Sequence, residues 1–265
     1  MIKLALLKHR VYSDYLLPSR LEEYRALLQF ALASNYMIVS VVDYYDLKRN
    51  NQLPIDKKII ICRHDIDTDP NTAKNFLKIE KQLGVRASYY FRLSTLSPGI
   101  MNEIEEYGSE ASYHYEEIAT YCKMYKIKDP KSVYREIEQM QSHFIENYCS
   151  IKSKFSLKMR TVCSHGDFVN RYLKIVNTEL LTAAVREKCG IECEAYDPII
   201  KENTLSLSDS CAPRFWQGES IFTAIKRGEN TINFLTHPRH WRVAHWENTK
   251  DNFYRVVEGI IYHYL

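Results

Sequence analysis

The apolar run Ile59-Ile60-Ile61-Cys62 most constrains the fold, because it leads directly into acidic residues spaced two apart. A short continuous apolar run followed by polar residues is typical of a strand buried on both faces, as in a parallel sheet. Successive side chains of a strand point to opposite faces, so Asp65 and Asp67 are predicted to share one face with Arg63.

Two carboxylates side by side at the C-terminal end of a strand repel each other unless a cation or a shared proton lies between them. In α/β folds, binding sites are built at this edge of the sheet. Asp65 and Asp67 are therefore either a metal ligand and a general base, or acids that cap the next helix and pair with Arg63. Pro70 ends the strand, and Asn71-Thr72 are predicted to cap the following helix.

Strands and helical patterns alternate along the rest of the chain. The other strands are predicted at residues 37–42, 86–92, 110–114, 159–165, 205–210 and 231–238. The helical patterns cover residues 11–34, 71–83, 100–107, 132–148, 220–226 and 247–262, with a polar turn at 47–54 and a further helix starting near residue 115. No linker or repeat interrupts this order. We therefore predict one α/β domain over residues 1–265 with a parallel sheet, open or closed into a barrel.

Composition excludes several classes of protein. The 265 residues carry a net charge of +3 with charges of both signs mixed along the chain, so no nucleic-acid partner is predicted. No stretch has the roughly 18 apolar residues of a membrane span, and the first ten residues do not have the pattern of a secretory signal. Seven cysteines without paired spacing favour a reducing compartment, so a cytoplasmic location is expected. Nothing in the sequence sets an oligomeric state.

Acids and imidazoles recur where predicted strands end. They are Asp65, Asp67, His114, His165, Asp209 and His237. Each has a structural explanation when taken alone, such as a hydrogen-bonded histidine or a turn cap. Together they form a ligand set suited to Zn²⁺ or a similar divalent ion with an open position for water. His64 and the remaining histidines, His240 among them, are assigned structural or surface roles.

These motifs, in this order, resemble the polysaccharide deacetylases with NodB homology, carbohydrate esterase family four, and especially their divergent branch with a His-Asp-x-Asp first motif. The resemblance covers about residues 57–241. The matching segments are Arg63 to Asp67, Ala87 to Phe91, Gly108 to Glu116, Ser164 to Gly166, Ser208 to Ser210 and Leu235 to Pro238. It implies a distorted (β/α) barrel of the NodB type.

The resemblance also implies roles for individual residues. Asp65 would be the base and Asp67 a metal ligand, with His114 as the metal histidine of the second motif. His237 would be the general acid, held charged by Asp209, and an oxyanion would be held by a backbone N–H near His165 or Gly166. The substrate-binding residues expected from it are Arg63, Glu116, Gly166, Trp216, Leu235 and Trp241.

The chain departs from the family pattern at the second motif, where Ile118 stands in place of a second histidine. The third metal ligand must therefore come from elsewhere, with His165 as the first candidate, Glu116 the second and Glu117 the third. Large aromatic residues could stack on a sugar ring or pack in the core with equal weight. They are Tyr115, Phe215, Trp216 and Trp241.

The function implied is metal-dependent removal of an N-acetyl group from an acetamido sugar or a glycan precursor, with Zn²⁺ as the expected cofactor. Two alternatives stay open. One is an amidohydrolase of the same fold that acts on a non-sugar or N-formyl substrate. The other is an inactive carbohydrate-binding relic, which the missing second histidine suggests.

Overall fold

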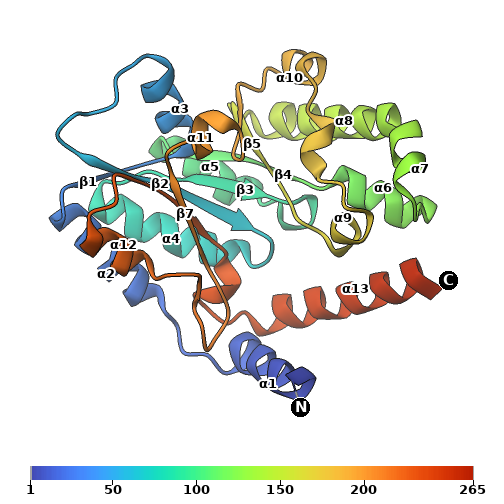
Figure 1. Cartoon of the computed structure of the whole chain (residues 1–265), viewed down its shortest axis with the longest axis horizontal. Coiled ribbons are helices and arrows are strands. Elements are labelled where there is room, and N and C mark those ends of the chain that lie inside the picture. Colours follow the sequence, from blue (N-terminus) through green and yellow to red (C-terminus); the bar gives the residue numbers. More distant parts are fainter. Residues whose placement is uncertain (1, 265) are drawn as a thin grey trace.

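The structure is a computed structural model that describes the backbone of residues 2–264 and the side chains of residues 8–264. Its centre is a curled, mostly parallel sheet (Figure 1). The strands are β1 (Tyr36–Val39), β2 (Lys58–Ile66), β3 (Ser88–Phe91), β4 (Glu110–Tyr115), β5 (Thr161–Ser164), β6 (Cys193–Glu194), β7 (Leu205–Asp209), β8 (Trp216–Gln217) and β9 (Thr231–Thr236).

The sheet forms a half-barrel. The strand order is β6-β5-β4-β3-β2-β9-β7-β8, and β1 pairs with the first half of β2. All pairs are parallel except β7 with β8. The predicted α/β class and parallel sheet are confirmed, and the curl agrees with a distorted barrel. Within the described residues β6 and β8 are edge strands, so the barrel stays open between them.

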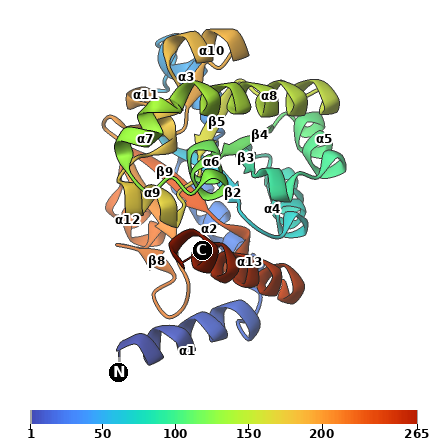
Figure 2. The same cartoon turned by 90° about the vertical axis from the view of Figure 1, so that its right-hand side faces the viewer.

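Helices cover the outer face of the sheet and fill part of the inner one (Figures 1 and 2). They are α1 (Ile2–Tyr15), α2 (Leu21–Ala33), α3 (Val41–Arg49), α4 (Pro70–Leu83), α5 (Pro98–Tyr107), α6 (Glu117–Tyr125), α7 (Pro130–Arg135), α8 (Ile137–Phe155), α9 (Phe168–Leu173), α10 (Ala183–Cys189), α11 (Pro198–Lys201), α12 (Ile221–Arg227) and α13 (His245–Tyr264). Short 3-10 turns lie at Leu93–Thr95, Asn177–Leu180 and Pro238–His240. Figure 2 shows α1 and α13 beside each other, away from the sheet.

Successive side chains of β2 point alternately into two separate hydrophobic cores. Ile60, Cys62 and Ile66 point outward into the larger core, which the sheet shares with helices such as α2, α4 and α8. Ile59 and Ile61 point inward, into a smaller core completed by side chains of α3 and α11. Because β2 keeps a period of two, its inward residues Arg63 and Asp65 lie on the concave face, directly beyond this smaller core.

Two predicted elements near the N-terminus are wrong. The predicted helix over residues 11–34 is broken between α1 and α2, because Pro18 lacks a backbone N–H and disfavours helical geometry in the preceding residue. The predicted strand over residues 37–42 ends at Val39, and α3 takes up its last two residues and the first three of the polar turn predicted at 47–54. The Ser40 hydroxyl caps α3 by accepting a hydrogen bond from the Asp43 N–H at 3.1 Å.

The cap of α4 also differs from the prediction of Asn71-Thr72. Asp69 is the cap residue, with Pro70 in the first turn. The Asp69 side chain accepts hydrogen bonds from the Thr72 N–H at 3.3 Å and from the Thr72 hydroxyl at 2.5 Å. Asp69 has a positive φ of 48°, a conformation in which Asp and Asn are enriched over most other residues. The third acid of the motif therefore builds the helix start, which leaves Asp65 and Asp67 for other roles.

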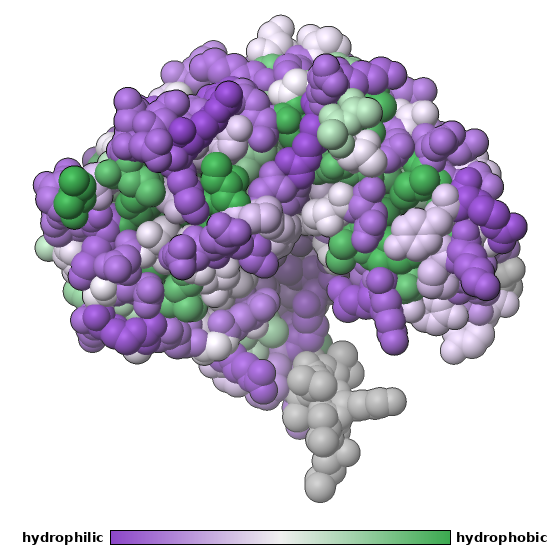
Figure 3. All heavy atoms as spheres, turned by 45° about the horizontal axis from the view of Figure 1, so that its top comes forward, coloured by the Kyte–Doolittle hydropathy of each residue, from purple (hydrophilic) through white to green (hydrophobic). Residues whose placement is uncertain are grey.

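The face of the molecule in Figure 3 is mainly hydrophilic, with small separate hydrophobic patches and a hollow near its middle. Among the described residues, none of the helices has the length and hydropathy needed to cross a membrane.

Candidate functional site

The predicted motif residues meet in one cavity of about 430 Å³ at the C-terminal end of the sheet. Its lining includes Arg63, Asp65, Asp67, His114, His165, Gly166, Leu235 and His237. These residues come from β2, β4, β9 and the loop after β5, because the C-terminal ends of parallel strands lie at the same edge. Five of the six strand-end residues therefore lie around one cavity, and the sixth, Asp209, contacts His237 behind its wall.

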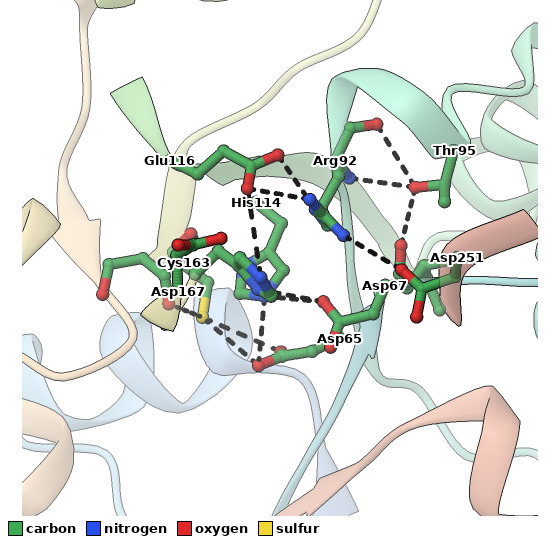
Figure 4. Close-up of polar contacts among 12 residues, drawn as sticks. Asp65, Asp67, Arg92, Thr95, His114, Glu116, Cys163, Asp167 and Asp251 are labelled. Atoms are coloured by element: carbon green, nitrogen blue, oxygen red, sulfur yellow. Dashed lines mark hydrogen bonds and ion pairs between the residues drawn. The ribbon is translucent and has the colours of Figure 1, made fainter. Parts of the chain in front are cut away.

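Three of these side chains form a compact donor cluster. The Asp67 Oδ1 atom lies 3.0 Å from Nδ1 of His165 and 3.4 Å from Nε2 of His114. The two imidazole nitrogens are 3.2 Å apart. Figure 4 shows Asp65 and Asp67 directed toward His114, with Glu116 paired with Arg92 nearby. The ligand atoms of Asp67, His114 and His165 all lie close enough together to bind one ion.

Backbone and side-chain contacts orient both imidazoles. Nδ1 of His114 lies 2.9 Å from the Cys163 carbonyl and donates to it, so Nε2 faces Asp67 as a lone-pair donor. The carbonyl of His165 accepts a hydrogen bond from the Asn177 amide at 2.6 Å. On the outer side of the His165 ring, Nε2 lies 3.9 Å from Oε2 of Glu116. His165 is thus placed to bind through Nδ1, with a carboxylate behind it.

The spacing and protonation of this cluster fit a divalent metal. Ligands at the usual zinc distances of about 2.0–2.1 Å in a tetrahedron lie about 3.3 Å from each other, close to the observed separations. The Asp67 Oδ1 atom is buried and makes no hydrogen bond of good geometry among the described residues. Burial raises the pKa of Asp67, but His165 and His114 outweigh it and hold that pKa well below its ordinary value. An anionic, unsatisfied oxygen between two imidazole nitrogens is a strong cation ligand.

Two other acid-and-histidine clusters in the described part of the chain are satisfied by hydrogen bonds instead. Glu80 accepts hydrogen bonds from Tyr24 and Tyr89 and lies 2.8 Å from Nε2 of His64, in a fully buried network without a cavity. Glu116 makes a two-pronged ion pair with Arg92, at 2.8 and 2.9 Å. His64 is thus structural, as predicted, and Asp67, His114 and His165 are the best candidate ligands.

Asp65 lies beside the donor cluster without a strong hydrogen bond of its own. Its nearest neighbours are Nε2 of His114 at 3.6 Å, the Cys163 thiol at 3.7 Å and Nη2 of Arg63 at 3.8 Å. The carboxylate is buried yet lines the cavity. A carboxylate with free lone pairs next to a metal site has the geometry of a general base.

Asp209 and His237 form a tight pair on the opposite wall. Nδ1 of His237 lies 2.7 Å from Oδ1 of Asp209, and the His237 backbone N–H donates to Oδ2 at 2.7 Å. Burial by itself would lower the pKa of His237, but the charge and hydrogen bond of Asp209 raise it to about 9. His237 therefore carries a proton at neutral pH, as a general acid requires.

Comparison with known proteins adds no family. No family model matches the chain, and no curated protein matches it.

Several residues predicted to contact substrate do not line the cavity. Trp241 is fully buried and donates its indole N–H to Oδ2 of Asp209 at 2.7 Å, so it cannot stack on a sugar. Trp216 packs against the core near Trp241, and Tyr115 is fully buried in the outer core. Glu116 is held by Arg92 as described above. Pattern alone cannot separate an aromatic that stacks on a ligand from one that packs in the core.

The two lower-ranked metal ligands are also excluded by their contacts. Glu117 accepts hydrogen bonds from the Tyr113 hydroxyl at 2.5 Å and the Asn147 amide at 3.0 Å, in the outer core. Glu116 reaches the centre only through the far side of His165. Among the predicted candidates, His165 alone presents a ligand atom toward both Asp67 and His114.

The structure adds residues that sequence reasoning missed. His240 places Nδ1 2.9 Å from Oδ1 of Asp209, next to His237. Tyr196 accepts a hydrogen bond from Arg63 at 2.7 Å, and Asn233 lines the cavity from β9. His240 and Trp241 follow His237 by three and four positions, so all three are near one another in the chain. Since a buried carboxylate such as Asp209 needs several hydrogen-bond donors, this spacing is a signal for His240. Tyr196 lies 133 positions from Arg63 and has no sequence signal.

Proposed function

We propose that this chain is a divalent-metal-dependent hydrolase of the NodB type that removes the N-acetyl group from an acetamido sugar or glycan precursor. The observation that carries the proposal is the convergence of Asp67, His114 and His165 on one point, with Asp65 and a protonated His237 lining the same cavity. Ligands, base and acid are the parts that hydrolysis of an amide requires.

The ligand set supplies the first part of the chemistry. A divalent ion held by Asp67, His114 and His165 would polarise the amide carbonyl and make a water molecule acidic near neutral pH. The Asp65 carboxylate is placed to accept the proton of that water, since no strong hydrogen bond occupies it. His165 supplies the ligand that Ile118 does not, which supports a working site over an inactive relic.

His237 supplies the second part. An amine leaves an amide poorly unless it is protonated, and Nε2 of His237 is free for this role because Nδ1 is committed to Asp209. Leu235, two residues earlier on β9, lines the cavity on the same face as His237 and would contact the acyl methyl group.

One of the two backbone N–H groups predicted to hold the oxyanion is excluded by its hydrogen bond. The His165 backbone N–H, one of the two predicted donors, is already bonded to the Tyr115 carbonyl at 2.8 Å. Gly166 lines the cavity and is the remaining candidate. A backbone N–H there would hold the developing negative charge on the carbonyl oxygen.

Release of carboxylic acid from purified protein tests the proposal. The protein is loaded with Zn²⁺ and incubated with neutral and acidic N-acetylated sugars, free and nucleotide-linked, and with their N-formyl analogues. Acetate should appear, and Asp65→Asn should lower its rate by about 10²–10⁴-fold, as expected for loss of a general base. Formate release from the N-formyl compounds alone would instead favour the deformylase alternative.

Metal analysis supplies the complementary control. Stoichiometric Zn²⁺ that is lost in Asp67→Asn supports the assigned ligands. Sugar binding without stoichiometric metal and without release of acetate or formate would contradict the proposal and favour a binding relic.

A further inference from the structure

The deep end of the cavity contains a buried cation that the proposed reaction does not use. Arg63 is 1% exposed and lines the cavity two residues before Asp65, on the same face of β2. Its Nη2 donates to the Tyr196 hydroxyl at 2.7 Å. Nε and Nη1 are buried and have no hydrogen-bond partner among the described residues. Burying charged N–H groups without hydrogen-bond partners costs free energy unless another group binds them.

Among the described residues, no carboxylate accepts a hydrogen bond from Arg63. Asp65 is 3.8 Å away, beyond hydrogen-bond distance, and belongs to the metal side of the cavity. The oxygens of Glu194 accept backbone N–H groups of Ser164 and Tyr196, at 2.8 and 2.5 Å. Once the charges of Asp65 and Asp67 face a divalent cation, the charges of Arg63 and of Lys201, which also lines the cavity, are left over. The cavity would then attract a negatively charged group.

Beyond Arg63 and Asn233 the lining is polar and opens toward solvent, since Lys201, Ser206 and Gln217 are exposed, and it suits a small hydrophilic ligand. The Asn233 Oδ1 atom is also buried without a partner, and Lys201 places its ammonium 5.5 Å from the Tyr196 ring that Arg63 covers from 4.4 Å. Further polar lining residues are Ser206, Ser208 and Gln217. They come from β7 and β8, across the open side of the half-barrel from Tyr196 and Lys201. The volume is at the small end of ligand sites and fits a single ring better than a polymer.

We infer that the deep end of the cavity binds an anionic group of the substrate, so that the preferred substrate is an acidic N-acylated sugar whose carboxylate contacts Arg63. This inference rests on the proposed function for the position of the amide at the metal cluster. Arg63 and Asp65 are two positions apart on one face of β2, and Nη2 of Arg63 lies 3.8 Å from Oδ2 of Asp65, so one small substrate can reach both.

The first experiment measures specificity on matched substrates. Acetate release by Zn²⁺-loaded protein is compared for N-acetylglucosamine, its C6 carboxylate (the uronic acid) and N-acetylglucosamine 1-phosphate. We expect the uronic acid to have the highest kcat/KM. Arg63→Gln should lower the ratio of uronic acid to neutral sugar by about 10- to 100-fold, the usual effect of losing a hydrogen bond to a charged group. Preference for the phosphate would assign the anion to a sugar phosphate and overturn the carboxylate inference, as would an unchanged ratio in Arg63→Gln.

The second experiment does not depend on catalysis. Binding of glucuronate, which has no amide, is measured by calorimetry on the zinc-loaded protein and on Arg63→Gln, with glucose as the neutral probe. Glucuronate should bind more tightly than glucose, and the difference should disappear in Arg63→Gln. Absence of acetate release with charge-selective binding retained would defeat the proposed function and leave the anion site standing. Equal binding of both sugars by the zinc-loaded protein would defeat the anion site.

Asn233→Asp keeps the test decisive if Arg63→Gln does not fold. This substitution has nearly the same shape and adds a negative charge to the cavity while Arg63 is intact. Glucuronate affinity should fall by about tenfold or more relative to glucose, because like charges repel in a buried site. An unchanged preference in Asn233→Asp would overturn the inference.

Discussion

At the scale of single residues, the site separates chemically similar side chains by what each contacts. Asp65 and Asp67 are two positions apart, yet only the Asp67 Oδ1 atom lies between the two imidazoles. Asp65 faces the cavity with its lone pairs free of strong hydrogen bonds. The proposed function therefore assigns the different roles of base and ligand to these neighbouring carboxylates, because their surroundings differ.

The first prediction separates these two roles by zinc affinity. Asp67→Asn should weaken zinc binding by about 10–100-fold or more, because it removes a charged ligand. Asp65→Asn should keep zinc and lose only acetate release. Titration of both variants with Zn²⁺ followed by an indicator dye measures the difference. Equal loss of zinc in both variants would make Asp65 a ligand as well, in a set with His114 and Cys163.

The second prediction concerns pH. In the proposed reaction His237 acts as the protonated acid. Its pKa of about 9 keeps it protonated across neutral pH, so kcat/KM should fall only as pH rises through about 9. Asp209→Asn removes the charge that raises this pKa. The basic limb of the pH profile, where kcat/KM falls, should therefore move toward about pH 6.5. His240→Gln leaves Asp209 ionised and should keep the limb near that of the unchanged protein. A basic limb that does not move in Asp209→Asn would exclude His237 as the acid.

At the scale of elements, the loop between β2 and α4 connects fold stability to the site. Asp69 caps α4 with a positive φ, directly after Asp67 and Thr68. Its hydrogen bonds to Thr72 fix the path of the chain as it leaves the strand. The position of the Asp67 carboxylate thus depends on a helix cap two residues later.

The third prediction tests this cap. Asp69→Ala removes the cap and places alanine at a positive φ, so the free energy of unfolding should fall by about 0.5–2 kcal/mol. Asp69→Asn is the matched control, because asparagine also caps helices and tolerates this conformation. Urea unfolding of both variants measures the effect. Similar stability for both would show that the cap contributes little.

At the scale of the whole molecule, the open side of the half-barrel shapes the cavity. A closed barrel would pair β6 with the β7 side of the sheet, and its interior would be filled with side chains. Here Tyr196 and Lys201, which follow β6, face Ser206 and Ser208 of β7 across the gap, and all four line the cavity. The missing strand pairing therefore leaves room for a ligand beside the metal cluster.

The fourth prediction is that zinc stabilises the whole fold. Asp67, His114 and His165 come from segments far apart in the chain, so an ion bound to all three binds only the folded state. At a free Zn²⁺ concentration 100 times the dissociation constant, the free energy of unfolding should rise by about 2.7 kcal/mol. Thermal unfolding with Zn²⁺ and with a chelator measures this rise. His165→Ala should show little of it, and a full rise in that variant would remove His165 from the ligand set.

Local patterns in the sequence determined the alternation of strands and helices, the inward position of Arg63 and Asp65, and the acids and histidines at strand ends. They determined these features because period, capping and strand termination depend on residues close together in the chain. The broken helix at Pro18 also had a local signal.

Only the tertiary structure decided which of these residues meet. The sequence left His165, Glu116 and Glu117 open as the third metal ligand. Only the packing shows that Glu116 pairs with Arg92 and that Glu117 accepts a hydrogen bond from Tyr113. The burial of Trp241 behind Asp209 and the gap beside Tyr196 also depend on strands brought together from distant parts of the chain. Contacts between distant residues are set by the whole fold, and a pattern confined to one segment does not contain them.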